Sequence, residues 1–202
     1  MPANTITVSP GNTKLGKMPN FSISAGSTCP GKSEFCQGCY AQKGFFQMPR
    51  LKSSYAQNLE ATQGDTFVDA MIGHIQQATR KVKVFRIHVS GDFYSATYIR
   101  KWIQIVKALP EVRFYAYTRS WRVKTIKPAL EELRALPNMQ LFASMDITII
   151  EPAPEGWRVA TIEPDPRYRG MKCLEQVGKM PDCQACGYCF RKTRGNVIFQ
   201  LH

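Results

Sequence analysis

Hydrophobic residues in the middle of the chain alternate between two periods. Residues 84–90 (VFRIHVS) place apolar and polar side chains in turn, which predicts a β-strand, and residues 95–109 repeat apolar side chains at helical spacing up to Pro110. The same succession of strand and helix runs on to residue 162. We expect strands over residues 84–90, 112–118, 139–145 and 157–162, and helices over residues 95–109 and 125–136.

The two ends of the chain complete this pattern. A short strand near residues 20–24 precedes a loop with cysteines, helices are expected over residues 54–62 and 66–81, and a last strand is expected over residues 196–201. Strands joined by single helices pair in parallel through right-handed crossovers. The pattern therefore predicts an α/β fold, a partial (β/α) barrel of five or six mainly parallel strands.

Regular alternation stops after Glu163, where prolines and glycines surround a cysteine-rich segment. We predict a partial barrel with an N-terminal cluster loop over residues 1–163. A cysteine-rich extension over residues 164–202 is predicted to pack on the same domain. The length of 202 residues suits one substantial core of this kind.

Composition narrows the class of protein. Hydrophobic residues make up 44% of the chain and aromatic residues 11%, which excludes a disordered chain. No apolar run reaches the roughly 18 residues of a membrane span, and the N-terminus lacks the regions of a secretory signal. We therefore expect a cytoplasmic protein with reduced thiols. The formal net charge of +12 suits a polyanionic or phosphate-bearing partner, and equally a generally basic surface.

All seven cysteines fall into two tight groups. The first is a Cys-x6-Cys-x2-Cys loop and the second a Cys-x9-Cys-x2-Cys-x2-Cys segment. Core cysteines would be scattered, and disulfides would be reduced in the cytosol, so metal ligation is the interpretation that remains. The predicted metal ligands are Cys29, Cys36 and Cys39 in the first group and Cys173, Cys183, Cys186 and Cys189 in the second.

The two groups differ by one thiolate. A four-iron cluster normally takes four thiolates, so three local cysteines leave one iron open to a substrate. Four cysteines close the coordination shell, which suits a structural or electron-transfer role. The alternative for the second group is zinc held by four thiolates, although the close Cys-x2-Cys-x2-Cys run favours a cluster. The expected cofactors are two [4Fe–4S] clusters.

Polar residues follow four of the predicted strands, at the edge where ligands bind in α/β folds. Polar residues also simply begin loops, but four such positions beside a cysteine loop favour a site. These positions are Ser90, Gly91 and Asp92, then Thr118, Arg119 and Ser120, then Ser144, Met145 and Asp146, and finally Glu163.

Alternation along two strands suggests further contacts. Arg86, His88 and Ser90 are expected to share one face, which would be the barrel interior, and a satisfied core histidine is the alternative for His88. Tyr115 and Tyr117 share one face of the next strand. They would either pack in the core or stack on an adenine or nucleobase.

These residue types suit S-adenosylmethionine, which chelates an open cluster iron through its amino and carboxylate groups. Backbone carbonyls and the carboxylate of residues 90–92 would receive the amino group, and Arg119 would pair with a carboxylate or phosphate. An electron from the reduced cluster would cleave the sulfonium and give a 5′-deoxyadenosyl radical. The predicted cofactor-binding residues are Ser90, Gly91, Asp92, His88, Tyr117, Arg119, Ser144 and Asp146.

Four longer motifs span most of the chain: NTKLGKMPNFS (residues 12–22), CPGKSEFCQGCYAQKG (29–44), FRIHVSGDFYSATYIRKW (85–102) and RFYAYTRSW (113–121). Together they resemble the gene product 88 family of phages and mobile elements. More distantly, the layout is similar to that of radical S-adenosylmethionine enzymes, whose cluster loop follows the first strand. That resemblance implies that residues 90–93 stand where a Gly-Gly-Glu-Pro-like motif receives the methionine amino group. The cysteine spacing is six and two here, against three and two in that superfamily.

The sequence thus predicts a radical S-adenosylmethionine-type enzyme with a catalytic and an auxiliary cluster. Its expected partners are S-adenosylmethionine, an external electron donor and, as first interpretation of the substrate, a nucleic acid or nucleotide; a peptide is the alternative substrate. Two other classes compete with it. One is a non-catalytic nucleic-acid-binding protein stapled by zinc or clusters, and the other is a redox or electron-transfer protein.

Overall fold

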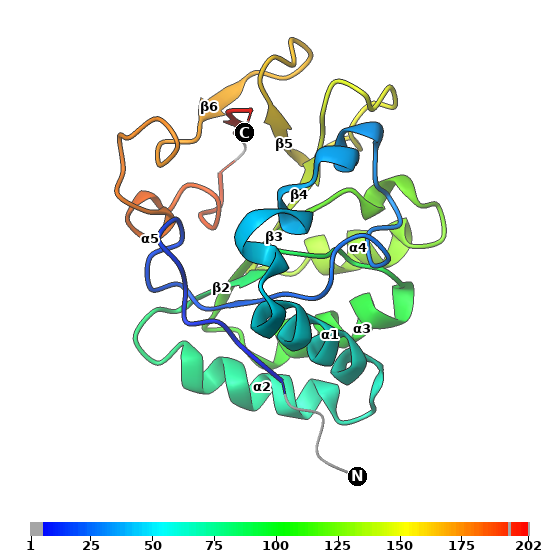
Figure 1. Ribbon diagram of the computed structural model, residues 1–202, viewed down its shortest axis with the longest axis vertical. Helices are drawn as coiled ribbons and strands as arrows, with labels where there is room; N and C mark the ends of the chain where they lie inside the picture. Colours follow the sequence, from blue (N-terminus) through cyan, green and yellow to red (C-terminus); the bar gives the residue numbers. More distant parts are fainter. Residues whose placement is uncertain (1–5, 194, 202) are drawn as a thin grey trace.

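The computed structural model describes residues 6–193 and 195–201, and a seven-stranded sheet runs through its centre (Figure 1). Every neighbouring pair of strands is parallel, and the order is β1-β2-β3-β4-β5-β7-β6. The two edge strands do not pair, so the sheet is open. The strands are β1 (Asn20–Phe21), β2 (Val84–Ile87), β3 (Arg113–Thr118), β4 (Met139–Ser144), β5 (Arg158–Ile162), β6 (Gly170–Lys172) and β7 (Asn196–Phe199).

The predicted helices are confirmed, with one further short helix in the cysteine-rich segment. Ser95 caps α3 by accepting a hydrogen bond from the Tyr98 amide, and prolines stand in the first turns of α1 and α4. The helices are α1 (Pro49–Gln63), α2 (Phe67–Ala78), α3 (Ala96–Ala108), α4 (Lys127–Arg134) and α5 (Cys183–Cys186). Short 3-10 turns are η1 (Glu34–Gly38), η2 (Tyr40–Gln42), η3 (Gly44–Gln47) and η4 (Ser120–Arg122).

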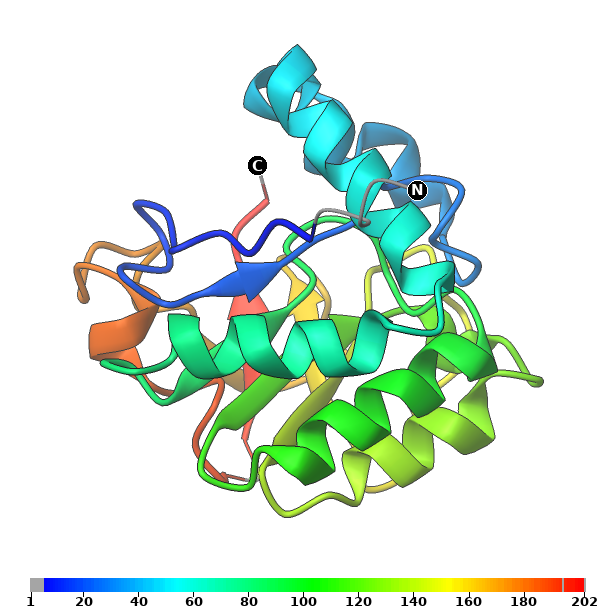
Figure 2. The same ribbon diagram turned by 90° about the horizontal axis from the view of Figure 1, so that it is seen from below.

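The main hydrophobic core lies between one face of the sheet and helices α2, α3 and α4, which lie side by side (Figure 2). Trp102 of α3 stands at its centre, fully buried among the rings of Phe21, Phe67, Phe85 and Tyr98. This is the apolar face that the helical spacing of residues 95–109 predicts.

The opposite face of the sheet is covered by the chain termini instead of helices. Val84 and Tyr115 pack there against residues 15–18 and Phe190, while Phe142 packs against Cys173 and Val197. Residues after 163 also supply β6 and β7 to the same sheet. The cysteine-rich segment is therefore built onto the sheet itself.

Two details differ from the sequence-based expectation. Strand β2 ends at Ile87 instead of residue 90, because His88 adopts a positive φ of 63°, which interrupts the alternation of the strand. Strand β6 was not expected, since its three residues begin with Gly170 and show no apolar alternation. No helix in the described part of the chain is long and apolar enough to cross a membrane.

The burial of His88 predicts a specific pH dependence of stability. Burial, and then the charge of Arg86, lower its pKa from 6.5 to about 3. Below pH 6.5 the unfolded chain takes up a proton that the folded chain does not. Stability is therefore expected to fall by about 1.4 kcal/mol per pH unit as the pH drops from 6.5 toward 3.

Urea unfolding at pH 7 and pH 5 of the wild type and of His88→Asn checks this expectation, because asparagine tolerates the positive φ and does not titrate. The difference in unfolding free energy between the two pH values is expected to shrink in the variant. His74→Asn, on the exposed side of α2, is the matched control and should change nothing. An equal pH difference in all three proteins would contradict the prediction.

Candidate functional site

The three-cysteine loop lies at the carboxyl ends of the parallel strands. It follows β1, and its backbone packs so closely on the turn after β3 that a Cβ on Gly31 would stand 2.0 Å from the carbonyl oxygen of Arg119. Arg122 donates hydrogen bonds to the carbonyls of Gly31 and Lys32. The loop is thus fixed against the rim that the sequence predicted for it, and only glycine fits at position 31.

A network around Asp146 ties the loop to the end of β4. Ser33, three residues before Cys36, donates to one Asp146 oxygen over 2.7 Å, and Arg119 forms a salt bridge of 2.9 Å with the same oxygen. Thr148 donates to the other oxygen. Burial raises the pKa of Asp146, but these hydrogen bonds and the charge of Arg119 outweigh burial and hold the pKa below its usual value. Asp146 therefore stays ionised and anchors the loop.

Asp92 joins the ends of β2 and β3. One of its oxygens accepts from the Phe93 amide and the Thr118 hydroxyl, and the other accepts from the Arg119 amide at 2.9 Å. Burial raises the pKa of Asp92, although these hydrogen bonds act to lower it. The carboxylate is occupied by the protein's own donors, so it positions the rim.

Ser90 differs from its neighbours because its hydroxyl is buried without a hydrogen-bond partner, while its carbonyl accepts from the Ile23 amide. Gly91 adopts a φ of +80°, and a Cβ there would meet Ile23 and Thr28. Ser144 lies at the end of β4 and accepts from the Trp121 indole through its carbonyl. The structure thus brings Ser90, Asp92, Arg119 and Asp146 together around the three-cysteine loop.

The expectation that His88 shares a face with Arg86 is wrong. The positive φ of His88 turns its ring to the helical side, where its Nε2 lies 2.8 Å from the Tyr98 hydroxyl and the ring packs edge-on to Phe93. Arg86 points to the other face and lies over the rings of Tyr115 and Tyr117. The structure therefore separates His88 from the rest of the predicted site.

Tyr117 lies beside the four-cysteine group. Its ring packs against Phe142 and Phe199 on the face opposite the helices, and its hydroxyl interacts with Cys189. At the rim, Tyr40 donates its hydroxyl to the Val89 carbonyl. The charge of Arg86 lowers the pKa of that hydroxyl, and Arg86 is also within electrostatic reach of Cys183 in the four-cysteine segment.

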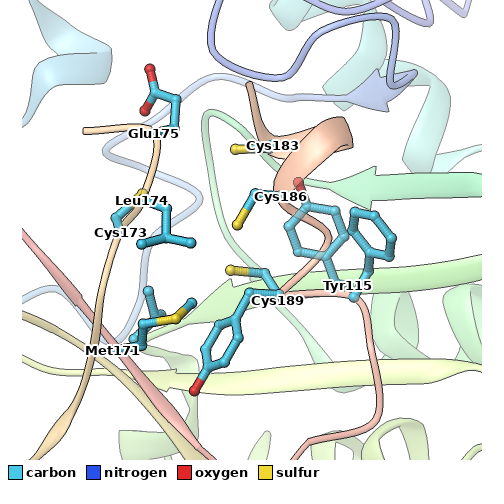
Figure 3. Close-up of a pocket in the computed structure, with 11 residues that line it drawn as sticks. Tyr115, Met171, Cys173, Leu174, Glu175, Cys183, Cys186 and Cys189 are labelled. Carbon is cyan, nitrogen blue, oxygen red and sulfur yellow. The ribbon is translucent and has the colours of Figure 1, made fainter. Parts of the chain in front are cut away.

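The four C-terminal cysteines line one cavity of about 20 Å³ (Figure 3). Cys183 and Cys186 begin and end α5, which Asp182 caps and Gly187 terminates in the left-handed conformation. In Figure 3 the sulfurs of Cys183, Cys186 and Cys189 point toward the segment that carries Cys173 and Leu174. The structure thus brings all four predicted ligands of this group to one place.

Two residues of the sheet bring polar groups to the four-cysteine segment. Tyr115 is 1% exposed, lines the cavity, and its hydroxyl has no hydrogen-bond partner. Arg158 of β5 donates to the carbonyls of Tyr188, Cys189, Arg191 and Gly195, and stacks over Phe142 at 4.2 Å. No acidic side chain of the described residues pairs with this buried cation. Its charge is free to balance thiolates.

Burial is the main influence on the pKa values of three of these thiols, Cys29, Cys183 and Cys189. It raises the pKa of Cys183 to about 12 and that of Cys29 to about 11, and the carboxylate of Asp92 adds to the effect on Cys29. Burial also raises the pKa of Cys189, although the hydrogen bond with Tyr117 and the charge of Arg158 act to lower it. These thiols are therefore protonated at neutral pH unless a metal displaces their protons.

Thiols are the donors that zinc and iron–sulfur clusters take, and four of them line one cavity while three share one loop. Among residues 6–193 and 195–201, no three histidine, cysteine or acidic side chains converge closely enough to hold a single metal ion. All seven cysteines are free thiols.

Sequence reasoning missed two residues of this site. Arg158 is the single charged residue of β5, on the same face as Ala160, and that charged position was the available signal. Ser33 gave no signal, because its partner Asp146 is 113 residues away.

Comparison with known proteins places the chain in a family. The sequence pattern of the gene product 88 family ("Gene product 88") matches residues 3–192. The chain belongs to the gene product 88 family. The matched region includes the three-cysteine loop and all four cysteines of the second group, so both candidate sites lie within the family's common extent.

Two curated relatives carry the same family name. The chain is 32% identical over 219 residues to the Gene 88 protein of Mycobacterium phage L5, covering 94% of this chain and 89% of that relative. It is 30% identical over 148 residues to the Gene 88 protein of Mycobacterium phage D29, covering 67% of this chain and 60% of that relative. No solved structure matches the chain significantly. These names state no activity, so they bring none to this protein.

Proposed function

We propose that this protein is a radical S-adenosylmethionine-type iron–sulfur enzyme. The observation that carries the proposal is the three-cysteine loop held at the carboxyl ends of a parallel sheet by Gly31, Ser33 and Asp146. A ligand bound at that edge is reached by residues from several strands. Three thiolates also leave one position of a four-iron cluster without a protein ligand.

The proposal assigns separate tasks to the residues of the rim. Cys29, Cys36 and Cys39 would hold the cluster, and Ser90 would contact the cofactor through its unpartnered hydroxyl. Arg119 would offer its guanidinium to a carboxylate, since it is partly exposed beside Asp146. Asp92 would act indirectly, because its oxygens are already bound by Thr118 and the Arg119 amide.

When bound, the reduced cluster supplies one electron, drawn from an external donor, that cleaves the sulfonium bond of S-adenosylmethionine to methionine and a 5′-deoxyadenosyl radical. The chain's own part is to bind both groups and to keep water away. Buried neighbours such as Thr28 and Asp92 support that role around Cys29.

The four-cysteine site would hold an auxiliary cluster. Support comes from the shared cavity, the unpartnered hydroxyl of Tyr115 and the two cations Arg86 and Arg158, which suit a group of net negative charge. We also interpret the open sheet as a partial (β/α) barrel with residues 164–202 as its cysteine-rich extension. A reducing compartment such as the cytoplasm would keep the thiols free for metal.

The test is the electron paramagnetic resonance spectrum of anaerobically prepared, reduced protein with and without S-adenosylmethionine. We expect two cluster signals, one of which shifts when the compound is added. The variant Ser90→Ala should need a higher concentration of S-adenosylmethionine to give that shift, whereas Ser54→Ala, partly exposed on α1, should not.

Other results assign the protein to a different class. Cluster signals that ignore S-adenosylmethionine would indicate a redox or electron-transfer protein. Zinc with no cluster signal would indicate a non-catalytic nucleic-acid-binding protein whose fold is stabilised by metal. Either outcome would overturn the proposed enzyme.

A further inference from the structure

An arm of the molecule beside the three-cysteine loop exposes aromatic and basic side chains together. We define the aromatic arm as residues 43–52, which form η3 and the start of α1. Phe45 is 70% exposed and Met48 50% exposed, and Tyr40, just before the arm, is also 50% exposed. Figure 2 shows the first turns of α1 standing clear of the rest of the fold.

The arm is not part of the core. The buried residues of α1 are Asn58, Ala61 and Thr62, all in its second half. The exposed rings of the arm are therefore not needed for packing against the sheet. Large apolar side chains left in water beside a candidate site indicate a binding surface more often than chance exposure does.

The charge of the arm has one sign. Lys43, Arg50 and Lys52 are exposed, and residues 43–52 include no acidic residue. None of the three forms an ion pair with another residue that the structure describes. Three unpaired cations around an exposed ring suit a partner that carries both negative charge and flat apolar surfaces.

The arm is connected to the candidate site through aromatic contacts. Phe46 packs edge-on to Tyr40 with ring centroids 5.5 Å apart, and also contacts Tyr55. Tyr40 follows Cys39 directly and donates its hydroxyl to the Val89 carbonyl at the rim. A partner lying along the arm would therefore pass beside the three-cysteine loop.

We propose that the aromatic arm binds single-stranded nucleic acid. Bases would stack on the ring of Phe45, and Lys43, Arg50 and Lys52 would contact phosphates. The inference rests on the proposed function and names the substrate class of the same site. It places base stacking on the arm instead of on Tyr115 of β3, which is buried.

Charge and geometry argue against other occupants. A second copy of this chain would bring two basic arms together in a protein of net charge +12, and a purely apolar partner would desolvate three cations. Paired bases in a duplex do not offer their faces to a protein ring. The arm should therefore prefer single strands to duplexes.

The experiment measures anisotropy of a labelled oligothymidine of about 16 nucleotides, an upper site size for one binding module, with the cluster-loaded protein over a range of salt concentrations. Phe45→Leu keeps apolar bulk but removes the ring, and should weaken binding about tenfold. The double variant Lys43→Gln, Arg50→Gln should make the plot of log affinity against log salt less steep. The change should correspond to the loss of about two phosphate contacts. The pair Arg80→Gln and Lys107→Gln, exposed elsewhere with the same loss of charge, is the control.

Three results would overturn the inference: equal effects of the arm and control pairs, equal affinity for a duplex, or a dimer that Phe45→Leu dissociates in sedimentation. The spectrum with S-adenosylmethionine is recorded on the same samples. Oligonucleotide binding without a spectral shift would contradict the proposed enzyme and support nucleic-acid binding by the arm. A spectral shift without arm-dependent binding would support the proposed enzyme and contradict nucleic-acid binding by the arm.

Discussion

Replacing Cys186 with alanine is expected to remove the proposed cluster of the C-terminal site and to leave the one proposed for the three-cysteine loop intact. Cys186 ends α5 and lines the same cavity as the other three cysteines of its group. The loop of Cys36 is instead held at the rim through Ser33 and Asp146. Since separate parts of the fold build the two sites, the loss of a ligand at one should not open the other.

The complementary variant is Cys36→Ala, which should remove only the signal that responds to S-adenosylmethionine. Iron content is expected to fall from about eight atoms per chain to about four in each variant, and to near zero when both changes are combined. Paramagnetic resonance identifies which cluster is left. If either single change abolished both clusters while the protein stayed folded, the division of ligands would be wrong.

Arg158→Ala is expected to empty the four-cysteine site without touching a cysteine. The guanidinium donates to the carbonyls of Tyr188, Cys189, Arg191 and Gly195, so one side chain holds most of the last stretch before β7. Alanine would leave these carbonyls without their donor and remove the stacking on Phe142. We expect a loss of about 3 kcal/mol in unfolding free energy, which corresponds to a melting temperature about 6–12 °C lower.

Two other variants separate the geometry of Arg158 from its charge. Arg158→Lys keeps the cation but not the fork of donors, and should give an intermediate loss of iron and stability. Arg134→Ala removes an arginine that also lies over a ring, that of Trp157, but is partly exposed and paired with Glu131, so its cost should stay within about 1 kcal/mol. Calorimetry and iron analysis measure both effects. Full iron loading and an unchanged melting temperature in Arg158→Ala would show that the segment is held by other contacts.

Much of the fold could be predicted from local patterns in the sequence. The alternation that begins at Val84 and the helical spacing around Trp102 correspond to β2 and α3, because burying one face of a strand or helix imposes a period on the sequence. Parallel pairing followed from the intervening helices. The position of the three-cysteine loop at the carboxyl edge followed from its place directly after β1.

Other features had no local signal. The turn of His88 away from Arg86 depends on one positive φ, and alternation alone predicted the opposite face. The link between Ser33 and Asp146 joins residues far apart in the chain. The exposure of Phe45 could not be predicted either, since the sequence does not show whether another element covers a given aromatic residue.

The sequence by itself determined the main succession of strands and helices up to residue 162, their parallel pairing and the two groups of cysteines, because each depends on near neighbours along the chain. Only the tertiary structure decided that the four cysteines share a cavity walled by Tyr115, that Arg158 holds their segment, and that the arm with Phe45 stands free beside the other three. These are contacts between distant segments, and their partners are chosen by how the whole chain packs.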